Sequence, residues 1–247
     1  MSGWGGPLDW DRLYREYLAS RKVDASGWAR YDLVPPTPVL HTLGAPTTED
    51  LEWLIAGLRD ERKWFVGFLL RRAPKISDVF LEPLLDAGIA EMEASAGPRY
   101  TRVCLDHEFD RVRMRNHLYS VIERGDDNQK AGAVYCLYGL GRGFGNGSEW
   151  DEGSVVRDLP LEIHRAEVLL RTFLETKHRL LRCAILVTLP FDLMRYPEEL
   201  RPLVGRTIAS AADSEDEHER WLIRYRGARG TAEHNRIGAE RPEPRRL

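Results

Sequence analysis

The stretch from Leu118 to Leu140, LYSVIERGDDNQKAGAVYCLYGL, restricts the possible folds of this chain most strongly. It predicts the apolar end of one helix, a break at Gly125, and a second helix that Asp126 or Asp127 caps. The second helix carries two apolar stripes, formed by Ala131, Val134, Tyr135 and Tyr138 and by Ala133, Leu137 and Leu140. Because a helix that is apolar on most of its circumference packs on more than one side, this segment predicts a stack of helices.

The same order of features occurs twice more along the chain. Residues 54–70 read LIAGLRDERKWFVGFLL, with an acidic break at Asp60-Glu61 before a very apolar helix. Residues 169–189 read LLRTFLETKHRLLRCAILVTL, with a polar break at 175–177. A helix, a short polar turn and a buried helix, repeated along one chain, indicate an α-solenoid, and an irregular all-α bundle is the alternative.

The repeated pattern resembles HEAT-like repeats, in which an acidic turn precedes a basic residue and an apolar helix rich in small residues. The best match consists of Asp127, Lys130, Ala131 and Leu137. A second match, with aromatic side chains where the family has small ones, consists of Asp60, Lys63, Trp64, Phe65, Phe68 and Leu70. In the third copy Arg182 is the basic residue, but it does not stand at the position that the pattern of the other copies gives. The resemblance implies an all-α fold, a HEAT-like α-α superhelix of stacked antiparallel helix pairs.

Four segments are expected. They are an aromatic-rich N-terminal capping segment (1–34), a Pro-rich connector (35–47), the HEAT-like repeats (48–227) and a disordered basic tail (228–247). In the first segment Asp9 caps a helix that runs to about Ser20, with an apolar stripe of Trp10, Leu13, Tyr14, Tyr17 and Leu18. We interpret this helix as the cap that closes one end of the stack, and an aromatic binding surface is the alternative.

Local signals divide the next part of the chain. The prolines of residues 35–47 exclude a helix and favour an extended connector. Thr47 or Thr48, followed by acidic residues, begins the next helix. Arg71 and Arg72 end a helix, where we expect them to complement the helix dipole rather than to hold a ligand.

Charge is distributed unevenly over the 247 residues. The formal net charge is −3, but the residues from Arg224 onward carry +4, which leaves −7 for the remainder. The tail could therefore contact nucleic acid weakly and in a salt-dependent way, through Arg226, Arg229, Arg245 and Arg246. Arg111 and Arg115 share one helix face, which is either a solvated charged face or part of a binding surface.

The glycine-rich stretch GLGRGFGNG fits neither a dinucleotide fingerprint nor a phosphate-binding loop. It begins a long loop, residues 141–155, in which acidic residues flank Trp150. A tryptophan in such a loop is a candidate anchor for a partner protein.

No local motif for catalysis is present in the sequence. The acidic cluster around His107 has no second ligand pair at helix spacing, so neither a metal nor another cofactor is expected. Three widely spaced cysteines favour a reducing compartment, with Cys136 and Cys183 buried in apolar helices. The absence of a long apolar run or a signal-like start favours a cytoplasmic protein without membrane contact.

These observations predict a non-enzymatic scaffold that binds another protein on the concave face of a helical-repeat array. The first alternative is a nucleic-acid binder that uses the arginine tail with Arg111 and Arg115. The second is a HEAT-like enzyme such as a DNA glycosylase. Such an enzyme needs a basic concave face, and the acidic composition outside the tail disfavours it.

Overall fold

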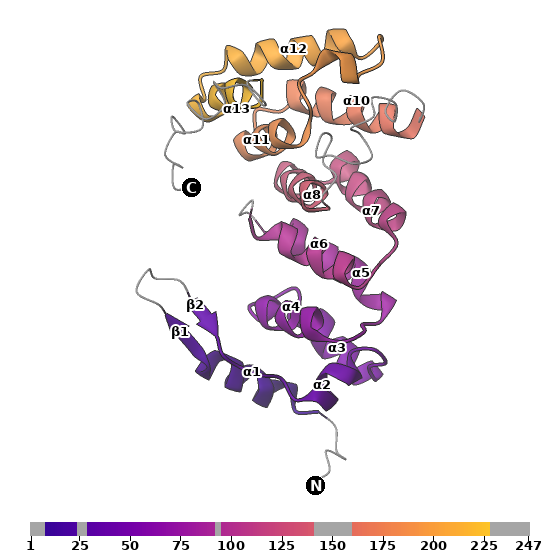
Figure 1. Ribbon diagram of the computed structural model, residues 1–247, viewed down its shortest axis with the longest axis vertical. Coiled ribbons are helices and arrows are strands. Elements are labelled where there is room, and N and C mark those ends of the chain that lie inside the picture. Colours follow the sequence, from indigo (N-terminus) through magenta and orange to yellow (C-terminus); the bar gives the residue numbers. More distant parts are fainter. Residues whose placement is uncertain (1–7, 24–28, 92–94, 141–159, 228–247) are drawn as a thin grey trace. The chain divides into compact units, whose positions relative to one another are not determined.

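The computed structural model describes residues 8–23, 29–91, 95–140 and 160–227 (Figure 1). These residues are mostly helical, which confirms the all-α prediction. They form twelve α-helices, two short 3-10 helices and one two-stranded antiparallel hairpin. The chain divides into two compact units. Unit 1 contains residues 1–87 and 100–114, and unit 2 contains residues 88–99 and 115–247.

Unit 1 combines the predicted N-terminal segment and connector with the first predicted helices of the repeat region. Its complete elements are α1 (Trp10–Ala19), β1 (Arg21–Val23), β2 (Ala29–Tyr31), α2 (Thr37–Thr42), α3 (Thr48–Gly57), α4 (Lys63–Arg72) and η1 (Asp78–Phe80). It also includes most of α5 (Leu81–Ile89), most of α6 (Gly97–Asp106) and the start of α7 (Arg111–Arg124). Within this unit α2 and α3 pack against α4.

Unit 2 contains the remaining helices. Its complete elements are α8 (Asp127–Gly139), α10 (Pro160–Glu175), α11 (Arg179–Thr188), η2 (Leu193–Arg195), α12 (Arg201–Ala212) and α13 (Glu217–Gly227). Helix α11 packs against α8 and α13, and α12 packs against α10 and α13 (Figure 1).

Side-chain caps begin the helices where the sequence predicts them. The Asp9 carboxylate accepts a hydrogen bond from the backbone N–H three residues later, at 2.8 Å, and starts α1. Thr47 and Asp50 form a reciprocal capping box at the start of α3, and Asp126 and Gln129 form another at the start of α8. Each cap satisfies otherwise unpaired backbone N–H groups and stabilises its helix by about 1 kcal/mol.

Helix α8 confirms the prediction of a helix buried on most sides. Every residue from Ala131 to Leu137 is buried, and burial ends at Tyr138, which is 39% exposed. Gly132 allows the backbone at Ile89, in the same unit, to approach closely, since a Cβ atom at residue 132 would lie 1.9 Å from the Ile89 carbonyl oxygen. The small residues of α8 thus permit packing on several sides at once.

The predicted absence of helix from residues 35–47 is wrong. Helix α2 occupies Thr37–Thr42, with Pro36 as its N-cap residue and Pro38 in its first turn. Proline is tolerated there because the first N–H groups of a helix have no intrahelical partner and the proline φ suits the helix. The prolines therefore mark where this helix starts.

The N-terminal segment also contains a hairpin that the sequence analysis did not predict. Strands β1 and β2 pair in antiparallel register, with Arg21 opposite Tyr31 and Val23 opposite Ala29. The backbone N–H of Asp32 donates to the Ser20 carbonyl at 3.3 Å. The hairpin thereby brings Tyr31 back beside the end of α1.

A buried ion pair joins α11 to α13 in unit 2. The guanidinium of Arg182 donates to both carboxylate oxygens of Glu219 at 2.8 Å and to the backbone carbonyl of Phe173 at 3.0 Å. It also lies 3.9 Å from the centre of the Phe173 ring. Glu219 is only 2% exposed, so this contact replaces the water that a buried carboxylate loses. Arg182, the basic residue of the third predicted repeat, therefore links α11 to α13.

Candidate functional site

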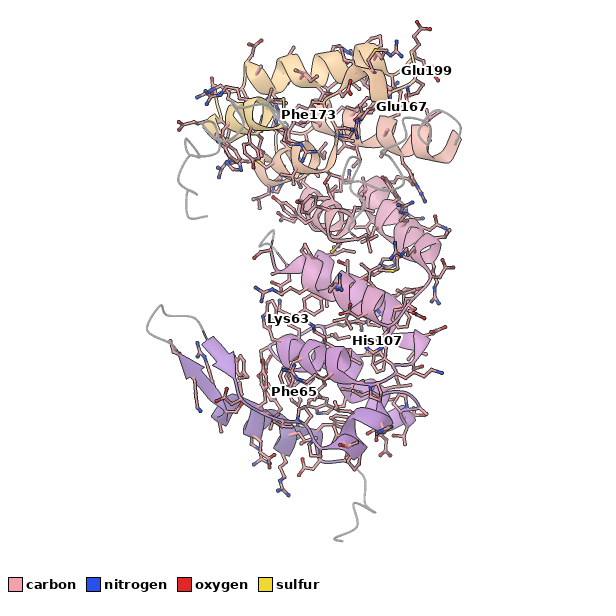
Figure 2. The ribbon with its side chains drawn as sticks, in the orientation of Figure 1. Lys63, Phe65, His107, Glu167, Phe173 and Glu199 are labelled. Atoms are coloured by element: carbon pink, nitrogen blue, oxygen red, sulfur yellow. The ribbon has the colours of Figure 1, made fainter. Side chains whose placement is uncertain are left out.

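An aromatic cluster in unit 1 gathers side chains from α1, β2 and α4. The rings of Tyr17 and Tyr31 stack with their centroids 4.0 Å apart and their planes 10° from parallel. The Tyr17 ring also packs against the rings of Phe65 and Phe68, with centroid separations of 5.1 Å and 5.2 Å. Phe65, labelled in Figure 2, is fully buried. The centroid of the Tyr14 ring lies 5.5 Å from that of Phe65. The rings of α4 therefore hold α1 and the hairpin in place.

The other end of α1 is fixed by two tryptophans. The Trp10 indole donates to a carboxylate oxygen of Asp50 at 2.7 Å, and the Trp53 indole donates to Asp11 at 3.0 Å. The two indole rings stack with their centroids 5.8 Å apart. These contacts combine apolar burial with satisfied polar groups, which fixes α1 firmly on α3.

The apolar stripe predicted for α1 is therefore confirmed at Trp10, Leu13 and Tyr17, all of them buried. Leu18 is 47% exposed and does not belong to the buried stripe. Burial raises the pKa of Tyr17 above its usual range, and the neighbouring Tyr31 raises it further. Because Tyr14 and Tyr31 remain half-buried, the segment serves as a packing element and also presents aromatic surface.

Two exposed arginines end α4 beside this cluster. The Arg72 guanidinium lies 3.8 Å from the centre of the Phe68 ring, one helical turn away. Neither Arg71 nor Arg72 makes an ion pair with any residue that the structure describes. Burial lowers the pKa of Arg72 from its usual value, and the charge of Arg71 lowers it further. The Arg72 guanidinium stays protonated at neutral pH.

We call the half-buried and exposed residues of this region the arginine–aromatic surface. It consists of Tyr14, Tyr31, Phe68, Arg71 and Arg72. Tyrosine and arginine are enriched among the residues that dominate binding energy at protein interfaces. The surface offers rigid rings next to guanidinium N–H donors. It is therefore suited to bind an anionic or aromatic group of another molecule.

Two other arginines of unit 1, Arg62 and Arg102, pair with carboxylates. The Arg62 guanidinium makes a bidentate contact with Asp60 at 2.6 to 3.0 Å and lies 4.3 Å from the centre of the Trp53 ring. Hydrogen bonding to Arg62 lowers the pKa of Asp60. Arg102 pairs with Asp106 at 2.8 Å. Unlike these two arginines, Arg71 and Arg72 have no carboxylate partner in the described part of the chain.

Three of the site residues predicted from the sequence are described by the structure, and none of the three belongs to this surface. Arg111 is exposed and Arg115 is half-buried, both on α7. The Arg226 guanidinium donates to the backbone carbonyls of Val187 at 2.5 Å and Leu189 at 3.0 Å, at the end of α11. Trp150, Arg229, Arg245 and Arg246 lie outside the described residues.

The arginine–aromatic surface was not predicted as a site. The i, i+4 spacing of Phe68 and Arg72 was the available local signal, since side chains at this spacing meet on one helix face.

The remaining candidate groups are the acidic cluster around His107 and the three cysteines. Within the described ranges, no group of three or more His, Cys, Asp or Glu side chains could hold a metal ion. The Nε2 of His107 lies 2.8 Å from the Leu70 carbonyl, which can only accept, so this nitrogen carries the proton and donates (Figure 2). The three cysteines are buried, and burial raises the pKa of Cys104 and of Cys183 to about 12.

Comparison of the chain with protein-family models, with curated proteins and with solved structures gives no match. Among the helices of the described segments, none combines the length and the apolar character that crossing a membrane requires.

Proposed function

We propose that this chain is a non-enzymatic scaffold that binds another protein and that the arginine–aromatic surface of unit 1 takes part in the contact. The observation that carries the proposal is the arrangement of Arg72 over Phe68, next to the stacked rings of Tyr17 and Tyr31. Rings that are already fixed by packing lose little conformational entropy on binding. Such groups therefore provide affinity efficiently.

The proposal includes a HEAT-like arrangement of the helices, with the partner on a concave face. Helices α4, α8 and α11 support it, since each follows a polar turn and buries an apolar face. Repeat arrays of this kind expose extended binding surfaces. The three buried thiols agree with a reducing compartment, and we propose the cytoplasm as the site of action.

A native affinity purification from the source cell, with and without nuclease, tests the proposal. We expect a stoichiometric partner protein under both conditions, and we expect a Phe68→Ala variant to recover less of it. The control is Tyr138→Ala, which removes an exposed ring from α8 in unit 2. A preparation without any stoichiometric protein would contradict the proposal. Recovery that disappears with nuclease would favour the nucleic-acid alternative.

A further inference from the structure

Arg71 and Arg72 place two adjacent positive charges at one end of α4 without a carboxylate partner among the described residues. They complement the negative end of the helix dipole, as the sequence predicts. That interaction is worth less than about 1 kcal/mol and does not use the N–H donors at the edge of either guanidinium. The donors are therefore available to a ligand.

The position of Arg72 is fixed before any ligand arrives. Its guanidinium lies over Phe68, the Phe68 ring contacts Tyr17, and Tyr17 stacks on Tyr31. This chain of contacts runs from α4 through α1 to β2, so the platform rests on three elements of one unit. A guanidinium that stacks on a ring through one face still presents its N–H groups in the fork that matches a carboxylate.

The charge of unit 1 favours a carboxylate ligand over a phosphate backbone. Residues 1–87 and 100–114 carry 14 Lys and Arg against 16 Asp and Glu, a net charge of −2. A nucleic-acid-binding surface needs a wider positive field, because it neutralises several phosphates at once. Two arginines beside aromatic rings instead match one or two carboxylates with an apolar neighbour.

We infer that Arg71 and Arg72 form the recognition site for an acidic segment of the partner protein, with Phe68 and Tyr31 as its aromatic floor. This inference rests on the proposed function and specifies the partner's chemistry. The carboxylates of the segment accept hydrogen bonds from the guanidinium groups, and its apolar atoms contact the rings.

Fluorescence anisotropy with a labelled oligoglutamate peptide tests the inference on the full chain. An oligothymidylate of equal charge serves as the phosphate probe. We expect the peptide to bind and the double variant Arg71→Gln/Arg72→Gln to weaken binding by about tenfold or more. The matched control is Arg12→Gln/Arg102→Gln, which removes the same charge from two exposed arginines that are already ion-paired. Glutamine has nearly the helix propensity of arginine, so both variants should keep the fold, as circular dichroism will check.

Three outcomes of the probe assay would overturn the inference: no peptide binding, equal weakening by both double variants, or tighter binding of the oligothymidylate. The native purification separates this inference from the proposed function. A partner that the Arg71→Gln/Arg72→Gln variant recovers as well as the unmodified chain does would refute the acidic-segment site and leave the scaffold proposal standing. A chain with no partner would refute the scaffold proposal itself.

Discussion

Gly132 of α8 lies directly against the backbone carbonyl of Ile89, the last residue of α5. A Cβ atom at residue 132 would stand 1.9 Å from that oxygen and 2.7 Å from its carbon. Real Cβ atoms do not approach so closely, and a backbone group cannot rotate away as a flexible side chain does. The close approach of these two segments of unit 2 therefore depends on a residue without a side chain.

Gly132→Ala should lower the free energy of unfolding by about 2 kcal/mol or more, because the helices must separate to admit one methyl group. Urea unfolding followed by circular dichroism measures the change. Gly205 of α12 provides the control, since a Cβ there would meet nothing within 4 Å. Gly205→Ala should stabilise the protein by roughly 0.5–1 kcal/mol through helix propensity alone. Equal effects of the two substitutions would contradict the close approach at Gly132.

Glu219→Ala should destabilise the protein by about 3 kcal/mol, since it leaves the half-buried Arg182 without its bidentate partner. Glu217 lies on the same helix and is exposed, so Glu217→Ala should change the stability by less than about 0.5 kcal/mol. Thermal unfolding of the two variants compares them directly. Similar melting temperatures would show that the buried contact does not hold α11 and α13 together.

The stability of unit 2 should decrease in acid through Asp216. Burial raises the pKa of its carboxyl, but hydrogen bonds from Arg179 and from backbone N–H groups outweigh burial and lower the pKa below its usual 3.8. A lowered pKa stabilises the fold above pH 3.8, and this contribution is lost as the pH falls through the lower, folded value.

The test is urea unfolding of the unmodified chain and of Asp216→Asn at several pH values between neutrality and strong acid. The variant should have a smaller acid dependence, because its side chain does not titrate. Parallel pH profiles for the two proteins would contradict the assignment.

The buried thiols should resist alkylation in the folded protein. Burial raises the pKa of Cys104 and Cys183 to about 12, so the reactive thiolate is scarce at pH 8. Iodoacetamide should label all three cysteines in denaturant, and mass spectrometry measures the labelling. Without denaturant, none of the three should be labelled quickly. Rapid labelling of the native chain would show that its helices open far more often than the packing implies.

The sequence predicted those features of the fold that depend on neighbouring residues. Asp9, Thr47 and Asp126 begin helices as expected, because a capping side chain bonds to backbone only two or three residues away. The burial of α8 followed from its small and apolar residues on every side. The sequence does not predict helix α2, because several prolines close together suggest an extended segment. Pro38, however, lies in the first turn of this helix, where proline is tolerated.

The hairpin and the arginine–aromatic surface depend on contacts that no local pattern encodes. Strands of three residues are too short to show an alternating pattern. The stacking of Tyr17 on Tyr31 requires the chain to reverse between them, so these rings meet only in the folded unit. The proximity of Arg72 to Phe68 is local. Its importance depends on the lack of a carboxylate partner among the residues that the structure describes, which the sequence does not show.

Site-specific photocrosslinking in the native cell tests the central claim most directly. A photoreactive phenylalanine analogue replaces Tyr31 on the arginine–aromatic surface or, as a control, Tyr138 on α8. The account predicts that residue 31 crosslinks to one partner protein, that residue 138 does not, and that Arg71→Gln/Arg72→Gln reduces the crosslink. The same crosslinks from both positions, or none from residue 31, would contradict it.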